Sequence, residues 1–475
     1  MEQIDRSLVK RLQEGKMTRR EFIVTAAAAG VSLSGIAGIL ASCAPTPTAT
    51  AVPVAPKPAG TVAPPKPVVT DKLRMKLRSS FITEGNEVLK VVAQQWGKEN
   101  GVSVEVDLAG MGDLQTIAGT AAETGAGPDI VEVFVNTPHV YAEKLADMSD
   151  VANELGAKFG GWYDLAKEAC VPASGKWIGL PRFYAAHCIV YRADLFKQVG
   201  HDKPAETWDE LLAIGKKLKE KKLPPLGFSL AHAVGDGSNF VYSMLWSFGG
   251  REVDKDGKTV VINSAETAKA IDFVRTLFQE TMTPAVLQWT DAENNRAFVS
   301  GEVAVTNNAS SIWWQARNVQ SIVGAPKNAV DLFNGTQHAL YPAGPAGRLL
   351  FTEMMSSIVF SYSKNVDAAK AFLRYLNDRP QMDPWVQANL TFCTPLLKGY
   401  EELPLMPWNS IPPLRPFKAA AQYGHLPGYP STNGRAAGEA FNKWIVHDMF
   451  AKACTGTSTK DAIVWAEEQL KKIYK

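Results

Sequence analysis

The sequence predicts an α/β protein with two domains. Short apolar strands alternate with amphipathic helices, which is the pattern of α/β domains whose sheets are covered by helices. Between residues 73 and 135 the predicted order is strand, helix, strand, helix, strand. The folded part begins near residue 71 and holds about 400 residues, which normally form two domains.

Periodicity predicts the elements of the first half. Residues 73–81, LRMKLRSSF, alternate as a strand does, and apolar side chains recur at helical spacing over residues 86–99. Residues 102–109 return to strand alternation. The run IVEVFV at 130–135 predicts a buried strand, which Gly127-Pro128-Asp129 separates from the preceding helix.

Helices dominate the second half. Thr207 is the expected N-cap of a helix, with Glu210 at the capping-box position three residues later. Ser264 and its neighbours open another helix that continues through IDFVRTLFQE. Residues 366–378 and 459–473 carry the remaining strong helical patterns.

The first 42 residues have the composition of a secretory signal. A basic start is followed by residues 22–42, which carry no charge and end in small side chains. The stretch is long enough to be weighed as a membrane-spanning helix, but its Ala, Gly and Ser content makes insertion weakly favourable.

Two short motifs refine this prediction. Arg19 and Arg20, in TRREFI, resemble the paired arginines of the twin-arginine export signal. Leu40-Ala41-Ser42-Cys43 resembles a lipobox, in which Cys43 becomes the first mature residue and its sulfur carries a diacylglycerol thioether. Two acyl chains give stable membrane attachment where one is marginal. The alternative is an ordinary signal peptide that contains a cysteine.

Residues 43–70 are expected to be the lipidated cysteine and a linker. The tract at 44–67 consists mainly of Pro, Ala, Thr and Val, with no aromatic residue and no acid. Such a segment cannot bury a core and predicts an extended spacer of roughly 3.1 Å per residue. It would hold the folded part away from a membrane.

Composition excludes one class of partner. Residues 1–42 contain six of the 50 basic and four of the 48 acidic residues, which leaves 44 of each and no net charge. We therefore expect no nucleic-acid partner, since phosphate binding needs a basic excess. Cys170, Cys188, Cys393 and Cys454 lack metal-site spacing. Cys170 and Cys188 could pair, but free buried thiols are the favoured interpretation.

Motifs of catalysis are absent from the sequence. It contains no G-x-S-x-G, H-E-x-x-H or C-x-x-C, so we expect no enzyme, no metal and no cofactor. A secreted glycoside hydrolase is the rival interpretation, because Glu84 and Glu353 could form the pair of carboxylates that such an enzyme needs.

Six landmarks in order resemble one family. They are GPDIVEVFVNTPHVYAEKLADMSDV, SGKWIGLPRFYAAHCIVYRADLFKQVG, PAETWDELLAIGKKL, AFVSGEVAVTNNASSIW, MMSSIVFSYSKNVDAAKAFLRYLND and TGTSTKDAIVWAEEQLKKI. Each alone is weak, but together they extend from about residue 73 to the end of the chain. On this resemblance the chain is identified as a family 1 extracellular solute-binding protein of an ABC importer, of the maltose-binding type.

The resemblance implies a two-lobe periplasmic binding protein-like (type II) fold. Lobe one would be 71–184 plus 345–396, and lobe two 188–342 plus 400–475. A small solute, most readily a sugar or oligosaccharide, would bind in the cleft and close the lobes by a hinge motion. The resemblance also implies ABC permease subunits as partners, a monomer, and a lipid-anchored location outside the cytoplasm.

A sugar needs aromatic planes for stacking, and acids and amides for hydrogen bonds. The adjacent Trp313 and Trp314 follow the polar run TNNASS, which we expect to be a loop, and at least one should face the ligand. Tyr184 lies where the family crosses between lobes, so it either contacts the ligand or packs in the hinge. The other candidates are Glu84, Asn136, Asp236, Asn239, Glu353 and Tyr429.

Each polar candidate has a structural alternative. A solvated turn would explain Glu84 and Asn136 equally well, and capping of a helix start would explain Asp236 and Asn239. Two other solutes stay open: a polyamine, which Glu84, Asp236 and Glu353 would suit, and glycerol phosphate, which would need a basic cleft.

Overall fold

The computed structural model describes residues 72–321 and 327–475. The predictions for Arg19, Arg20, Cys43 and the proline-rich linker lie outside these described residues. Within them, no helix combines the length and apolarity that a membrane crossing requires.

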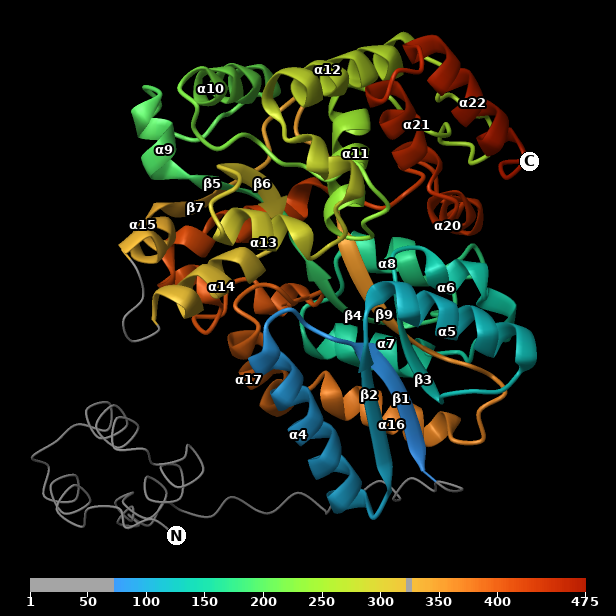
Figure 1. The fold of residues 1–475 in the computed structure, drawn as a ribbon. Helices are drawn as coiled ribbons and strands as arrows, with labels where there is room; N and C mark the ends of the chain where they lie inside the picture. The colour runs from blue at the N-terminus through green and yellow to red at the C-terminus, as the bar shows by residue number, and fades with distance from the viewer. Residues whose placement is uncertain (1–71, 322–326) are drawn as a thin grey trace, which may run out of the picture. The chain divides into compact units, whose positions relative to one another are not determined.

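A six-stranded mixed sheet organises the first lobe (Figure 1). Its strands, in spatial order, are β10 (Thr394–Pro395), β4 (Leu180–Ala185), β9 (Glu353–Val359), β3 (Ile130–Phe134), β1 (Leu73–Arg78) and β2 (Val104–Ala109). Strand β1 is parallel to β2 and β3, whereas β9 runs antiparallel to β3 and β4. We call this sheet and the helices packed on it lobe one.

Helices of lobe one are α4 (Thr83–Asn100), α5 (Met111–Thr124), α6 (Thr137–Val140), α7 (Ser149–Lys158), α8 (Asp164–Cys170), α16 (Val366–Leu376) and α17 (Arg379–Ala388). The helix predicted over residues 86–99 is confirmed as part of α4; its Trp96 is buried against Phe372 of α16, whereas Val91 is 59 % exposed. Asp129 fixes the start of β3, because its carboxylate accepts a 2.8 Å hydrogen bond from the Arg74 backbone N–H in β1.

A three-stranded antiparallel sheet lies in the second lobe, with the order β6 (Val305–Asn308), β5 (Cys188–Arg192) and β7 (Thr336–Ala339). Its helices before β9 are α9 (Ala193–Gln198), α10 (Trp208–Glu220), α11 (Asp236–Ser247), α12 (Ala265–Thr281), α13 (Glu293–Val299), α14 (Ser311–Gln320) and α15 (Lys327–Gly335). Those after it are α18 (Pro407–Ser410), α19 (Pro416–Ala420), α20 (Gly434–Asn442), α21 (Ile445–Cys454) and α22 (Thr459–Lys471). We call this group lobe two.

Helix α11 is the centre of lobe two. All twelve of its residues are buried, and it packs against α12, α21 and β6 (Figure 1). A helix covered on every side needs apolar or internally bonded side chains all round, which the sequence DGSNFVYSMLWS supplies. Beside it, β8 (Leu350–Phe351) pairs in parallel with β11 (Gly424–His425).

Local predictions for helix starts hold. The Glu210 N–H donates to Thr207 Oγ1 at 3.2 Å, and the Thr267 N–H donates to Ser264 Oγ at 3.1 Å. The Glu210 carboxylate reaches back one residue beyond the expected position, to the Glu206 N–H at 2.7 Å. Cys170, Cys188, Cys393 and Cys454 are buried and unpaired, as the favoured interpretation expected.

The chain passes between the lobes at the ends of strands. It leaves the six-stranded sheet after Ala185 and enters the three-stranded sheet at Cys188. It returns between β7 and β9, and leaves again after β10. The residues at these crossings and at the facing strand ends therefore come together. The limits predicted for the two lobes stay a prediction.

Candidate ligand-binding site

Five charged or titratable side chains meet where the lobes face each other. Arg78 ends β1 and Glu353 begins β9 in lobe one, while Asp236 begins α11 and Asp291 precedes α13 in lobe two. His187 lies between them on the crossing from β4 to β5. We call these five residues the charged cluster.

Contacts within the charged cluster join the two lobes. Arg78 Nη2 lies 2.9 Å from Glu353 Oε1. His187 places Nε2 at 3.6 Å from Glu353 Oε2 and Nδ1 at 3.5 Å from Asp236 Oδ1. The ion pair lies within lobe one, and the imidazole of His187 connects Glu353 of lobe one with Asp236 of lobe two.

The backbone fixes the acids and the arginine of this cluster. The Arg78 N–H donates to the Glu132 carboxylate at 2.6 Å. Asp291 Oδ1 accepts two hydrogen bonds of 2.9 Å, from the N–H groups of Gly235 and Asp236, and so caps the start of α11 from a distant segment. These main-chain contacts hold the side chains in place without using up the guanidinium of Arg78.

The pKa values of the three carboxyl groups in the charged cluster shift in different directions. Burial, and then the negative charges of Asp291 and Glu353, hold the pKa of Asp236 well above that of an exposed aspartate. Burial also raises the pKa of Asp291. Burial opposes ionisation of Glu353, but Arg78 and His187 outweigh it and lower the Glu353 pKa. Glu353 is therefore the carboxylate that Arg78 neutralises.

Two buried donors in the cluster lack an acceptor. Nε and Nη1 of Arg78 make no hydrogen bond, although the residue is only 5 % exposed. Buried polar groups are normally paired, because an unpaired one costs about 1–3 kcal/mol. These open donors point to a ligand that supplies oxygen acceptors.

Two cavities adjoin the cluster. A small one, of about 10 Å³, is lined by all five cluster residues together with Gly235, Asn308 and Ser311. A second, of about 420 Å³, extends from residues 78–81 of lobe one to residues 290–292 of lobe two. They share Arg78, Phe81, Met111 and Asp291, so the small cavity is the deep end of a larger cleft.

Trp313 and Trp314 lie on α14, not on the loop that the sequence analysis expected. Successive helix residues point about 100° apart, so the two rings face different surroundings. Trp313 is buried against Phe333 in lobe two, at 5.6 Å between ring centroids. Trp314 is half-buried and reaches lobe one, where its Nε1–H donates to Glu84 Oε1 at 3.1 Å. Trp314 is the tryptophan at the boundary between the lobes.

Replacing Glu84 by alanine is expected to weaken ligand binding two- to tenfold. The change removes a hydrogen bond between the lobes, and such a bond typically contributes about 0.5–1.5 kcal/mol. Titration of the ligand by Trp fluorescence measures the effect. Glu87→Ala, on the exposed face of the same helix but paired with Lys90 at 3.0 Å, is the matched control. Equal affinities of the two variants would contradict the role of Glu84.

Asn136 and Tyr429 line a separate cavity of about 320 Å³, bounded by α8 and the segment 426–434. Asn136 Nδ2 donates to the Pro427 carbonyl at 3.4 Å, whereas its Oδ1 has no partner. The preceding Val135 has a φ of 43°, a left-handed conformation that a β-branched residue rarely adopts. The strained turn aims Asn136 at the C-terminal segment.

Tyr184 and Asn239 are placed in packing roles. Tyr184 is 2 % exposed, its ring lies 6.3 Å from that of Tyr163, and burial raises its pKa. Asn239 is fully buried, and its Nδ2 donates to the Phe351 carbonyl at 2.7 Å. The structure thus brings Asp236 and Glu353 together in one cluster and pairs Glu84 with Trp314. It leaves Tyr184, Asn239 and Trp313 in the packed interior.

Sequence reasoning did not name Arg78 or Asp291. Arg78 ends a strand whose carboxyl end opens towards the cleft, and that position was its available signal. Asp291 had no such signal, since it lies in a short connection and acquires its role by capping α11. His187 lies three residues after the predicted Tyr184 and was not among the candidates either.

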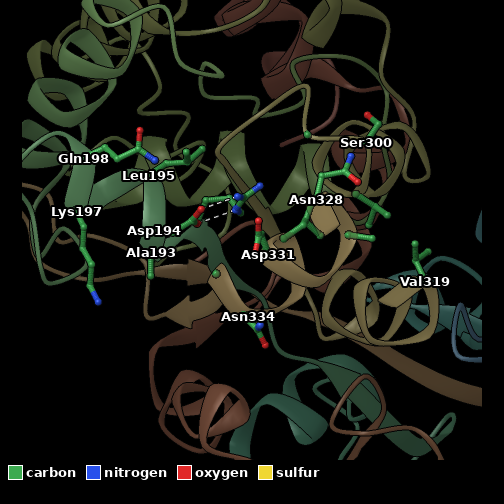
Figure 2. Close-up of a pocket in the computed structure, with 16 residues that line it drawn as sticks. Ala193, Asp194, Leu195, Lys197, Gln198, Ser300, Val319, Asn328, Asp331 and Asn334 are labelled. Atoms are coloured by element: carbon green, nitrogen blue, oxygen red, sulfur yellow. Dashed lines mark hydrogen bonds and ion pairs between the residues drawn. The ribbon is translucent and has the colours of Figure 1, made fainter. Parts of the chain in front are cut away.

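A larger cavity, of about 670 Å³, lies away from the cleft (Figure 2). Its walls are residues of α9, α14 and α15 and of the turn at 299–301, all in lobe two. Asp194 on this wall is held by Arg192 through hydrogen bonds of 2.8 and 2.6 Å. Because only one lobe lines it, closing of the two lobes would not enclose a ligand there.

Comparison with known protein families shows which family the chain belongs to. The model of the bacterial extracellular solute-binding proteins matches residues 82–383. The chain belongs to that family. The match contains Glu84, His187, Asp236, Asp291 and Glu353, and Arg78 precedes it by four residues.

Curated relatives of this solute-binding protein are distant. A protein of Deinococcus radiodurans described as a probable ABC transporter-binding protein is 27% identical over 62% of this chain and 70% of its own length. A binding protein of Brucella abortus is 27% identical over 50% of this chain, and the match spans 60% of that relative.

Solved structures confirm the predicted two-lobe fold. Maltose-bound MalE3 of T. maritima aligns with a TM-score of 0.71 at 21% identity, covering 84% of this chain and 99% of that one. A solute-binding protein of Thermotoga lettingae with bound α-D-tagatose aligns with a TM-score of 0.72 at 20% identity, covering 86% of this chain and 100% of that one. At these identities the likeness shows the fold alone.

Proposed function

We propose that this solute-binding protein captures a carbohydrate in the cleft between its lobes and delivers it to the permease of an ABC importer. The observation that carries the proposal is the charged cluster, which combines carboxylates with buried donors that lack acceptors. Sugar hydroxyls both donate and accept, so they satisfy carboxylates and guanidinium groups together. The structural neighbours described as bound to maltose and to tagatose support this class of ligand.

Apolar surfaces beside the cluster fit the faces of a sugar ring. Phe81 and Phe392 line the small cavity, with their ring centroids 5.9 Å apart, and Met111 lies next to them. Aromatic rings at this position would cover C–H faces while the cluster binds hydroxyls. Glycerol phosphate fits less well, because three carboxylates in the cluster would repel a phosphate.

A thermal-shift screen tests the proposal. A ligand that binds only the folded state raises the melting temperature, so mono- and disaccharides, polyamines and glycerol phosphate can be compared directly. We expect carbohydrates to raise it, and polyamines and glycerol phosphate to leave it unchanged. Hydrolysis of the added oligosaccharides by purified protein would contradict the proposal and favour the glycoside hydrolase.

Attachment at Cys43 belongs to the same proposal. Delivery to a membrane importer is more efficient when the binding protein cannot diffuse away, and two acyl chains suffice to hold it. Mass spectrometry of protein purified from its native membrane is expected to show an N-terminal, diacylated Cys43. An intact Met1, or cleavage at another residue, would contradict this prediction.

A further inference from the structure

The charged cluster contains more negative than positive groups. Three carboxylates, those of Asp236, Asp291 and Glu353, face one guanidinium and one imidazole. Arg78 neutralises Glu353 at 2.9 Å, while Asp291 receives only backbone N–H groups. Even with a protonated His187, one carboxylate lacks a full opposite charge. Burying an unpaired charge is costly, so that carboxyl group is either protonated or paired with a cation from outside the chain.

A second, independent observation concerns oxygen acceptors. Arg78 is buried with two guanidinium nitrogens that make no hydrogen bond, and it lines both the small and the large cavity. Its side chain is held over the Phe392 ring, with 4.9 Å from Cζ to the ring centroid. The open nitrogens therefore require an acceptor that the ligand brings, next to its cationic group.

The dimensions of the small cavity select the size of the cation. Its volume of about 10 Å³ is close to the least that holds one water molecule. Gly235 is part of the reason for this opening, because a Cβ at that position would lie 2.8 Å from Glu353 Oε2 and 3.3 Å from Asp291 Oδ1. An ammonium group fits this space, and a sugar ring does not.

We propose that the preferred ligand is an amino sugar, whose ammonium group enters the small cavity between Asp236, Asp291 and Glu353 while a neighbouring hydroxyl accepts hydrogen bonds from Arg78. The sugar ring then occupies the cavity of about 420 Å³ beside Phe81 and Met111. This inference rests on the proposed carbohydrate function and specifies its substrate class.

Other solutes satisfy only part of the site. A neutral sugar leaves the surplus negative charge uncompensated. A polyamine supplies cations but no oxygen acceptor for Arg78. An amino acid adds a carboxylate, which the carboxylates of the cluster repel.

Matched sugars test the proposal. Isothermal titration of the full-length protein at neutral pH compares glucosamine with glucose and N-acetylglucosamine, and the disaccharide of glucosamine with cellobiose and diacetylchitobiose. Within each set the amine is the varied group. We expect the free amine to bind at least about tenfold more tightly than its neutral counterparts, a difference that corresponds to about 1.4 kcal/mol.

The possible results distinguish failure of the amino-sugar proposal from failure of the carbohydrate function on which it rests. Equal or tighter binding of the neutral sugars would overturn the amino-sugar proposal and leave the carbohydrate function standing. Binding of spermidine or glutamate with no carbohydrate bound would overturn both. Absence of any carbohydrate binding in these sets and in the wider screen would also overturn both.

Two isosteric variants test whether these carboxylates contact the ammonium group. Asp236→Asn and Asp291→Asn keep the size and an acceptor oxygen but remove a charge. Each is expected to lower glucosamine affinity about tenfold and glucose affinity by a clearly smaller factor, while the ligand-free melting temperature stays the same or rises. Glu87→Gln, on the exposed face of α4, should leave both affinities unchanged. Equal losses for glucose and glucosamine would contradict the assignment of the ammonium to these carboxylates.

Discussion

Replacing Arg182 by methionine is expected to lower the free energy of unfolding by about 3–5 kcal/mol. Arg182 and Glu132 are each 1 % exposed, with 3.2 Å between Nε of Arg182 and Oε1 of Glu132. The guanidinium also donates to Asn377 Oδ1 at 3.2 Å and lies over the Trp385 ring. Its loss leaves a buried carboxylate without an opposite charge, which costs far more than the pair contributes when intact.

Loss of Arg182 is also expected to disturb the ligand site. The other oxygen of Glu132 accepts the 2.6 Å hydrogen bond from the Arg78 N–H, so Glu132 connects the core of lobe one to the charged cluster. A displaced Glu132 would release the end of β1. We therefore expect the Arg182 variant to bind ligand less tightly even at temperatures where it stays folded.

Urea unfolding followed by tryptophan fluorescence measures the stability change. Arg296→Met is the matched control, because Arg296 pairs with Glu302 at 2.7 Å on the surface and such pairs contribute about 0–1 kcal/mol. The double variant Arg182→Met/Glu132→Gln should recover part of the loss, since the amide keeps an acceptor for the Arg78 N–H without a charge. A loss no larger than that of Arg296→Met would contradict the structural role.

Gly235→Ala is expected to abolish high-affinity binding without impairing folding. Gly235 has φ −85° and ψ −75°, a conformation that alanine adopts readily, and removing a glycine restricts the unfolded chain. Its added Cβ would nevertheless lie 2.8 Å from Glu353 Oε2, in the small cavity. Arg78 holds that carboxylate, so it cannot move aside freely. We expect at least a tenfold weaker affinity, which is about 1.4 kcal/mol.

Titration of the carbohydrate that gives the largest thermal shift measures this effect. Gly112→Ala is the control, because a Cβ there meets nothing within 4 Å and the residue lies in α5, near the same cleft. The control should bind normally and melt at the same or a slightly higher temperature. Unchanged affinity in Gly235→Ala would show that the small cavity takes no part in binding.

Much of the fold could be predicted because its signals are local. The alternation in LRMKLRSSF predicted β1, although the strand ends at Arg78 and the rest forms the turn into α4. Thr207 was predicted as a cap and Ser264 as part of a helix start, and both side chains cap their helices, because a cap depends on residues three positions apart. Reasoning from local sequence also explains why the two tryptophans were misplaced. They were placed on a loop because they follow the polar run TNNASS, whereas the structure places them on α14, which packs against α13 and α15.

The candidate site was predicted in part. Asp236 and Glu353 were named because each stands at the start of an element, and both belong to the charged cluster. Tyr184 and Asn239 had similar positions in the sequence but contact other segments, Tyr184 the ring of Tyr163 and Asn239 the carbonyl of Phe351. A position at the start or end of an element is visible in a sequence, whereas the segment that covers it is not.

The sequence by itself determined the alternation of strands and helices, the export and anchoring predictions, and the family, because motifs and periods are properties of neighbouring residues. Only the tertiary structure decided that Arg78, His187, Asp236, Asp291 and Glu353 share one cluster. These residues lie on segments far apart in the chain, and the crossings between lobes bring them together. The surplus of carboxylates and the unpaired Arg78 nitrogens exist only because these residues are brought together. Which side chains are buried and which find a partner depends on the folded cleft.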